Sequence, residues 1–389
     1  MGDFFYLKTT TLSYTIYNSV SKLPEGWNQL AVQNIFLSKE YLEVLEKSSP
    51  VNMTCHFIGF FHENKLCGIA LSQFLDVNKL DSFGERDQCG KKIIRNFIFK
   101  NFSSHVLFIG NNMLTGQNAF SFLPIIDKKL AIETLKKASE ELISIFKNKK
   151  IKIHLVTFKD FDSDEIQDIE KVNFTDYFKF SIQPNMLFEI NENWKSEENY
   201  IESLSKKYRD QYKRARKKSA EIVKRKMHLD EIIKYEETIY DLYFHVAKNA
   251  PFNTFFLAKN HFRIFKELLK DKFLFYGYFI EDKLVGFNTL IKNGDAMDTY
   301  FLGYDDKIQR DKMLYLNMLY DMIAYSINKG FKKIVFARTA LEIKSSVGAK
   351  PIKMFGIIKH QNKSINKYMD KIFPYLEPEV KWQERNPFK

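Results

Sequence analysis

Glycine and proline are scarce in this 389-residue chain, at 15 and 9 residues, which excludes collagen-like and low-complexity linker proteins. The three cysteines, Cys55, Cys67 and Cys89, are odd in number and show no CxxC spacing. We therefore expect reduced, buried thiols in a cytoplasmic protein. No run approaches eighteen apolar residues, and Met1–Phe5 shows no secretory pattern, so neither a spanning helix nor a signal peptide is predicted.

Motifs of metal and covalent catalysis are also lacking. The eight histidines form no HExxH motif and no His/Cys pairing, so we expect no metal site. There is no Gly-x-Ser-x-Gly elbow, and no cysteine stands in a context that marks a nucleophile. If the chain is an enzyme, direct attack of an amine on a bound ester or thioester is the simpler hypothesis.

The chain has enough length and apolar surface for two domains. Thirty-seven Phe and twenty Tyr supply ample area for two cores, and the length suits two domains of roughly 190 residues each. Residues 191–199 form the most polar uninterrupted stretch and mark the expected boundary. We therefore predict one domain at 1–192 and a second at 193–389.

A short sequence recurs in both halves. Ile58–Gly68 reads IGFFHENKLCG, and Tyr276–Gly286, 218 residues later, reads YGYFIEDKLVG, with six of eleven positions identical. Each copy is an apolar strand, a polar turn and a second apolar strand, which is typical of a β-hairpin. Apolar-periodic stretches that open with Phe36–Lys39 and Phe256–Lys259 precede the two hairpins. Chance recurrence is the alternative, but the matching element order favours duplication of a whole domain.

The second half predicts one unit with a mixed αβ sheet. Its expected elements are two helices, a hairpin, a third strand, a helix closed by Gly330 and two last strands, at 231–248, 261–269, 274–291, 298–304, 311–329, 333–337 and 354–359, with a strand leading from Ile222. In the first half, a helix from Ser38, the hairpin and a long helix capped by Asp127 follow the same order.

Most of the net charge of +12 lies in one segment. Residues 203–226 carry +9, from eleven basic and two acidic residues. We predict a helix over 203–218 with Leu204, Tyr208, Tyr212 and Ala215 on one face. Such concentration indicates an anionic partner: cofactor phosphates, tRNA or lipid headgroups. A solvated helix face is the alternative; the candidates for phosphate contact are Lys206, Lys207, Arg209, Lys213 and Arg214.

The order of elements is that of the GNAT acyltransferase superfamily, and two such units in one chain resemble its FemAB-like branch, the peptidoglycan aminoacyl transferases. Residues 204–217 resemble that branch's Leu-x-x-Lys-x-Arg…Lys-Ala-x-Lys helix. Residues 342–351 are similar to the Glu-His-Lys-x-x-Arg-Gly-Phe-x-Pro segment of a FemAB-like subfamily, with matches at Glu342, Lys344, Gly348 and Pro351. The resemblance covers most of residues 30–375 and implies an α/β fold of two tandem GNAT-like acyltransferase domains with mixed sheets.

Two departures limit what the resemblance implies about mechanism. Ile343 and Val347 replace the His and Arg of that segment, so a mechanism that uses those side chains is in doubt here. GNAT enzymes that use coenzyme A hold its pyrophosphate on a glycine-rich turn before a helix, and the matching loop, 303–312, has one Gly. Arg310 and Lys312 are candidates for phosphate contact there. The acyl donor stays open between acyl-CoA, acyl carrier protein and aminoacyl-tRNA.

The densest polar cluster, residues 338–346, directly follows a strongly apolar strand. Acyl transfer to an amine needs a neutral amine, donors for the developing oxyanion and a proton route to the leaving group. Glu342 is the candidate base or amine orienter, and Arg338 and Lys344 are candidates for binding the oxyanion or an anionic substrate group. Ser345 and Ser346 are candidate substrate ligands. The alternative is a surface salt-bridge network in which Arg338 pairs with Glu342 at i,i+4.

Two further side chains are candidates for proton transfer. Tyr304 ends the third strand and could protonate the leaving group; a core tyrosine is the alternative. By period-two alternation it is expected to share a face with Asp298, Tyr300 and Leu302. His360 ends the strand after the polar cluster and is expected either to face that cluster or to be structural.

Two functions of different class follow. The first is an N-acyltransferase that moves an acyl or aminoacyl group to a primary amine of a cell-envelope precursor, by resemblance a peptidoglycan stem peptide or an amino lipid such as a sphingoid-like base. The second is a non-catalytic GNAT-fold protein that binds tRNA or anionic membrane through the basic helix. Expected partners are the amine-bearing precursor, tRNA or acyl carrier protein, and the anionic inner membrane, touched peripherally from the cytoplasm; DNA is not expected.

Overall fold

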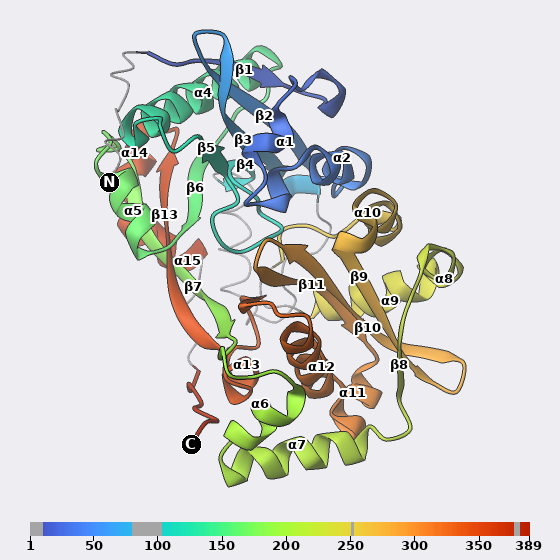
Figure 1. Cartoon of the computed structure of the whole chain (residues 1–389). Coiled ribbons are helices and arrows are strands. Elements are labelled where there is room, and N and C mark those ends of the chain that lie inside the picture. The colour runs from blue at the N-terminus through green and yellow to red at the C-terminus, as the bar shows by residue number, and fades with distance from the viewer. Residues whose placement is uncertain (1–10, 80–102, 250–252, 377–381) are drawn as a thin grey trace. The chain divides into compact units, whose positions relative to one another are not determined.

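The computed structural model describes residues 11–79, 103–249, 253–376 and 382–389. The chain divides into two compact units (Figure 1). Unit 1 is Met1–Ile182 with Lys353–Glu379, and unit 2 is Gln183–Ile352 with Val380–Lys389. Strands β7 (Phe178–Glu189) and β13 (Lys350–His360) each pass from one unit to the other. The division at residue 192 stays a prediction. It did not foresee that two strands would each have residues in both units.

Unit 1 contains a mixed sheet in the order β1-β2-β3-β4-β6-β13, with β5 paired to β3. Strands β4 and β6 are parallel, and the other neighbours are antiparallel. Helices α4 and α5 cover one face, where Leu135, Leu142 and Ile166 pack on Phe60, Leu107 and Phe158. The elements are β1 Ser13–Tyr17, α1 Trp27–Leu30, α2 Lys39–Ser48, β2 Met53–His62, β3 Lys65–Asp76, β4 His105–Ile109, β5 Phe120–Phe122, α4 Lys128–Asn148, β6 Leu155–Phe161, α5 Ser163–Glu170, α14 Lys363–Asn366 and α15 Met369–Leu376.

Unit 2 repeats this order as β8-β9-β10-β11-β12-β7. Strands β11 and β12 are the parallel pair. Helix α12 covers one face of the sheet, and α9 and α10 pack on the other through aromatic contacts such as Phe262 with Phe275. The elements are α6 Glu197–Ser203, α7 Lys206–Lys218, β8 Val223–Lys226, α8 Leu229–Lys234, α9 Glu236–Lys248, α10 His261–Leu269, β9 Phe273–Ile280, β10 Lys283–Asn293, β11 Ala296–Tyr304, α11 Asp306–Lys312, α12 Leu314–Asn328, β12 Lys333–Ala337 and α13 Leu341–Ser346.

The two units exchange their last strands. Strand β7 follows unit 1 in sequence, but its end pairs antiparallel with β12 of unit 2 from Met186 to Glu189. Strand β13 follows unit 2 in sequence and pairs with β6 of unit 1 from Phe355 to His360. Each sheet therefore receives its sixth strand from the other half of the sequence.

Both predicted hairpins are confirmed. Each joins its strands through a two-residue turn, Glu63-Asn64 in unit 1 and Glu281-Asp282 in unit 2. Glu63 and Asn64 both have positive φ, at 47° and 62°, and Glu281 has φ of 51°. Left-handed turn residues match the right-handed twist of the flanking strands, which is why such turns close hairpins.

The predicted helix ends are also confirmed where side chains cap them. The Ser38 side chain accepts from the Tyr41 N–H at the start of α2, and Asp127 accepts from the Leu130 N–H at the start of α4. Gly330 follows α12 with a φ of 72°. In the described part of the chain no helix is long and apolar enough to cross a membrane. Cys55 and Cys67 are free thiols, half-buried and buried, and Cys89 lies outside the described residues.

Two predicted helices differ from the observed ones in their bounds. The helix expected over 231–248 breaks at Tyr235, between α8 and α9. The helix expected over 203–218 begins only at Lys206, because Leu204 is extended and pairs with Phe388 through a backbone bridge. Inward positions of α7 are as predicted, with Tyr208 and Ala215 buried.

Candidate active site

The parallel strands of unit 2 pair over only part of their length. Ala296–Asp298 of β11 pair with Lys333–Val335 of β12, while β11 continues to Tyr304. Beyond Asp298, no strand among the described residues pairs with the edge of β11 that faced β12. Backbone N–H and C=O groups on such an edge need a hydrogen-bonding partner, so this is where an extended substrate can bind.

A β-bulge lies in β11 at this place. The register with β10 shifts between Thr299 and Leu302, so that two residues of β11 lie opposite Thr289. The Thr289 hydroxyl donates to the Phe301 carbonyl at 2.6 Å. A bulge aims the residues on its two sides differently and is common near active sites.

The bulge overturns the prediction that Tyr300 and Tyr304 share a face. The Tyr300 hydroxyl lies 3.0 Å from His261 Nε2 on α10, whereas the Tyr304 ring lies 6.2 Å from Tyr315 on α12, on the other face of the sheet. The extra residue in β11 breaks the two-residue alternation on which the prediction rested. Burial, and then Asp306, raises the pKa of Tyr304, which therefore keeps its proton.

The turn after β12 is strained and is braced by Lys344. Ala337, Thr339 and Ala340 have φ of 57°, 69° and 47°, conformations that cost non-glycine residues about 1–3 kcal/mol each. Lys344 Nζ donates to the carbonyl of Arg338 at 2.6 Å and to that of Ala337 at 3.3 Å. The Lys344 side chain is only 5% exposed, and this burial lowers its pKa to about 7. Lys344, which was predicted to bind an anion, therefore donates its hydrogen bonds to two backbone carbonyls.

Glu342 is held by a residue that no sequence motif marks. Its carboxylate is 51% exposed and accepts from the Arg385 guanidinium, 43 positions downstream, with Nε at 3.1 Å. The Arg385 N–H also donates to the Ser345 hydroxyl at 3.0 Å. The pairing of Glu342 with Arg338, considered from the sequence, is replaced by this one. Arg338 itself is half-buried in the braced turn.

Ser345 and Ser346 are occupied within the fold. Their hydroxyls donate to the carbonyls of Glu342 and Ile343, one turn back in α13. Gln211 of α7 donates to the Ser346 hydroxyl at 3.4 Å. Both serines are buried, so they position α13 between the C-terminal segment and α7.

The turn that would hold coenzyme A does not fit a pyrophosphate. Asp305 caps α11, and its carboxylate accepts from the N–H groups of Lys307 and Ile308 at 2.9 and 3.1 Å. A phosphate would have to displace that carboxylate and overcome its charge. Lys312 pairs with Glu221 at 3.0 Å, and Arg310 is an exposed residue of α11.

His360 belongs to unit 1, whereas the other candidates belong to unit 2. Its Nδ1 accepts from the Asn362 N–H at 2.9 Å, and its ring stacks on His154 at 6.5 Å between centroids. His154 in turn stacks on His105 at 5.2 Å. Three imidazoles therefore form a row across β4, the start of β6 and β13. The structure gives His360 a place in this row.

The corresponding end of unit 1 is filled by its own side chains. Lys159 and Asp160 at the end of β6 form an ion pair of 2.6 Å with side chains 8% and 2% exposed. Lys159 Nζ also approaches the Asn111 carbonyl at 3.5 Å, and the Asn111 amide donates to the Tyr41 hydroxyl at 2.7 Å. In unit 1 this buried pair directly follows the end of the β4–β6 pairing, the place that corresponds to the end of the β11–β12 pairing in unit 2.

No known family profile matches the sequence, and no curated protein does. Solved structures do match. FemX aligns with a TM-score of 0.50 at 11% identity, over 85% of this chain and 93% of FemX. L-PGS from Bacillus licheniformis gives 0.46 at 11% identity, over 87% and 95%. A tandem GNAT protein from the clavulanic acid biosynthesis pathway gives 0.45 at 8% identity, over 90% and 99%.

The chain thus has a mixed α/β fold of two tandem GNAT-like units. Among FemAB-like proteins of this architecture, FemX is one that it matches over most of both chains. At this identity the likeness concerns the fold alone.

Proposed function

We propose that the chain is an N-acyltransferase of the GNAT type that moves an acyl or aminoacyl group onto a primary amine of a cell-envelope precursor. The observation that carries the proposal is that β11 continues past its pairing with β12 beside a bulge, in a fold shared with FemX. The unpaired edge of β11 offers backbone N–H groups to the donor's carbonyl oxygen, where negative charge develops during attack.

The candidate side chains then take distinct roles. Tyr304, protonated at neutral pH, is placed at the end of that edge to give its proton to the leaving group. Glu342, with Oε1 on Arg385, orients the attacking amine from the solvent side. Lys344 does not touch the substrate but maintains the turn that follows β12. Arg338 lies in that turn and is proposed to bind an anionic group of the substrate.

The donor is proposed to be carried by acyl carrier protein or tRNA rather than by free coenzyme A. This is supported by the backbone N–H groups of Lys307 and Ile308, which already donate to the Asp305 carboxylate and so are not free to bind a pyrophosphate. The acceptor is proposed to be a peptidoglycan stem peptide or an amino lipid, in keeping with the FemAB-like resemblance of residues 342–351. Unit 2 is favoured as the catalytic unit because the buried Lys159–Asp160 pair closes the equivalent place in unit 1.

Mass spectrometry of envelope lipids and peptidoglycan precursors tests the proposal. A strain that lacks the gene is compared with the same strain carrying the wild-type gene or the Glu342→Gln variant. The expected result is loss of one N-acylated species and accumulation of its free amine, restored by the wild type. An unchanged set of amine-bearing lipids and precursors would reject an envelope substrate.

A further inference from the structure

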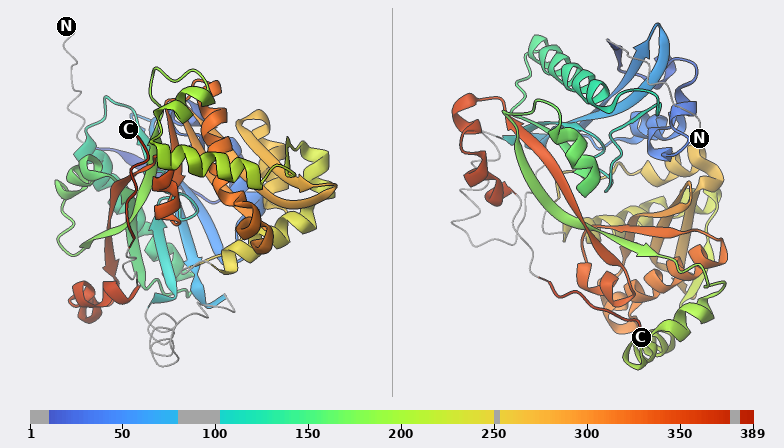
Figure 2. Two further views of the ribbon diagram at one scale, coloured as in Figure 1. Left: turned by 90° about the horizontal axis from the view of Figure 1, so that it is seen from below. Right: turned by 60° about the vertical axis from the view of Figure 1, so that its left-hand side comes forward.

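The outward face of α7 is a row of cations without acidic partners. Six of its basic residues are exposed, and within the described residues none of them forms an ion pair: Lys206, Lys207, Lys213, Arg214, Lys217 and Lys218. In the right-hand view of Figure 2 the helix lies at the lower edge of unit 2. Asp210, the one acidic residue in the helix, is exposed on the same face and forms no ion pair within the described residues.

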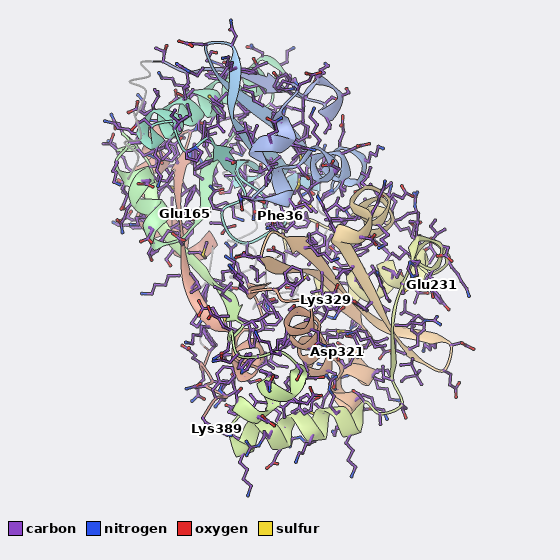
Figure 3. The ribbon with its side chains drawn as sticks, viewed as in Figure 1. Phe36, Glu165, Glu231, Asp321, Lys329 and Lys389 are labelled. Atoms are coloured by element: carbon purple, nitrogen blue, oxygen red, sulfur yellow. The ribbon has the colours of Figure 1, made fainter. Side chains whose placement is uncertain are left out.

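The inward side of the same helix is arranged differently. Arg216 pairs with Glu197 and with Asp321, both at 2.7 Å, and the Tyr278 hydroxyl also donates to Asp321. Asp321 lies on α12 (Figure 3). The chain thus neutralises the cation that faces its own core and leaves the outer six unmatched.

The outer cations also repel one another. Lys213 and Lys217 stand at i,i+4, as do Arg214 and Lys218, and like charges at this spacing destabilise a helix. Basic residues in the last turn interact favourably with the helix dipole, which accounts for part of the pattern. It does not account for Lys206 and Lys207 in the first turn, where that interaction is unfavourable.

The aromatic residues of α7 are turned away from this face. Tyr208 is buried, and Tyr212 donates its hydroxyl to Glu197 at 2.8 Å. Binding of single-stranded nucleic acid relies on exposed rings on which bases stack, and this face of α7 presents none. A helix of thirteen residues is straight over about 20 Å. At about 100° per residue, Lys206, Lys213 and Lys217 follow one line along it and Lys207, Arg214 and Lys218 follow a second line about a quarter turn away, so a flat surface can approach between the two.

We propose that the outward face of α7 docks the protein on an anionic lipid surface through headgroup phosphates. Charge complementarity is the attraction, because the face has no apolar side chain to insert between lipids. Gln211 links α7 to Ser346 of α13, so the docked helix lies next to the helix that carries Glu342. An amine on a membrane-anchored acceptor would then be close to the candidate site. The docking is independent of acyl transfer and can be measured without it.

Co-sedimentation of the full chain with vesicles tests this proposal. The vesicles are equimolar phosphatidylglycerol and phosphatidylcholine, with pure phosphatidylcholine for comparison, at 0.1 M salt. The triple variant Lys213→Glu, Arg214→Glu, Lys217→Glu is compared with a control of equal charge change on exposed positions of α4, Lys129→Glu, Lys137→Glu, Lys147→Glu. Circular dichroism and thermal melting establish that both variants fold.

The expected result is binding of the wild type to the anionic vesicles only, weakened at least about 100-fold in the α7 variant, since each cation near an anionic surface contributes about a fivefold gain. The α4 variant should bind within about threefold of the wild type. Absence of binding to anionic vesicles, equal loss in both variants, or tighter binding to total tRNA than to vesicles at the same salt would each overturn the assignment.

Discussion

Cys67 and Val285 occupy the same position in two copies of one hairpin, and each is the extra residue of a β-bulge. In unit 1, Phe60 and Phe61 face Gly68 and Leu66, which leaves Cys67 over; in unit 2, Val285 is left over in the same way. Both are third in the second strand. A bulge is an irregularity with no reason to recur at one position in unrelated hairpins. The repeated sequence therefore reflects repeated backbone structure, as duplication predicts.

The C-terminal segment should depend on the absence of a side chain at Gly348. This residue has a φ of 110°, and an added Cβ would lie 2.4 Å from the Phe388 ring. Gly348→Ala should destabilise the chain by about 2 kcal/mol or more, because strain and a clash combine. Gly294→Ala, at a φ of 59° with nothing within 4 Å, is the control for strain alone. Urea denaturation checks both; equal losses would remove the role assigned to Phe388.

Lys344 should make stability rise with pH above neutrality. Burial lowers its pKa from 10.5 to about 7, so between these values the unfolded chain holds a proton that the folded chain has lost. The free energy of unfolding should rise across that window, by at most about 1.4 kcal/mol per pH unit. Denaturation at pH 7 and pH 9.5 should show this rise in the wild type and in Lys350→Met, an exposed control, but not in Lys344→Met. A rise of the same size in Lys344→Met would show that Lys344 is not its source.

The contribution of Asp298 to stability should change with pH in the direction opposite to that of Lys344. Burial raises its pKa from 3.8 to about 7, with a weaker opposing bond from Asn293. The folded state therefore binds the proton more tightly, and the contribution of Asp298 to the free energy of unfolding should fall as pH rises from about 4 to about 7. Asp298→Asn should remove this contribution, so that the variant gains stability relative to the wild type as pH rises, while Asp295→Asn, at an exposed position, should not. Thermal melting at pH 4.5 and 7.5 measures the difference. A curve for Asp298→Asn that matches the wild type would disprove the effect.

The row of stacked histidines should make unit 1 sensitive to acid. Burial, followed by His105, Lys152 and His360, lowers the pKa of His154 from 6.5 to about 4. As pH falls, His154 is therefore protonated in the unfolded chain before it is protonated in the folded one. Its contribution to the free energy of unfolding should be lost as pH falls from 6.5 towards 4. His154→Gln should reduce that loss, measured by denaturation at pH 6.5 and 4.5. Part of it should remain through His56, whose pKa burial also lowers to about 4. No reduction in the variant would mean that the row is only packing.

Local patterns identified much of this fold in advance. The hairpins follow from apolar strands around polar turns, and Ser38 and Asp127 mark helix starts because their side chains satisfy free N–H groups. The exchange of β7 and β13 was not predictable in this way. Strand periodicity says which face is buried, and it carries no information on which neighbour a strand pairs with.

The site was predicted less completely than the fold. Residues 338–346 do form a distinctive turn and helix, but their sequence could not reveal that Lys344 is buried against carbonyls 337 and 338. Arg385 was missed because nothing near it forms a motif. The capping role of Asp305 was predictable from the sequence, because an aspartate just before a helix is a typical N-cap.

The reaction proposed for this chain forms an amide between an activated acyl group and an amine of a membrane or wall precursor. The most direct measurement incubates the purified chain with envelope extract and, in turn, acyl carrier protein thioesters, aminoacyl-tRNA and acyl-CoA, and detects new amides by mass spectrometry. We predict an amide from one carrier-bound donor, with the rate lowered at least about tenfold in Glu342→Gln and Tyr304→Phe and unchanged in Lys350→Met. A folded wild-type chain that forms no amide from any of the three donors would contradict the account.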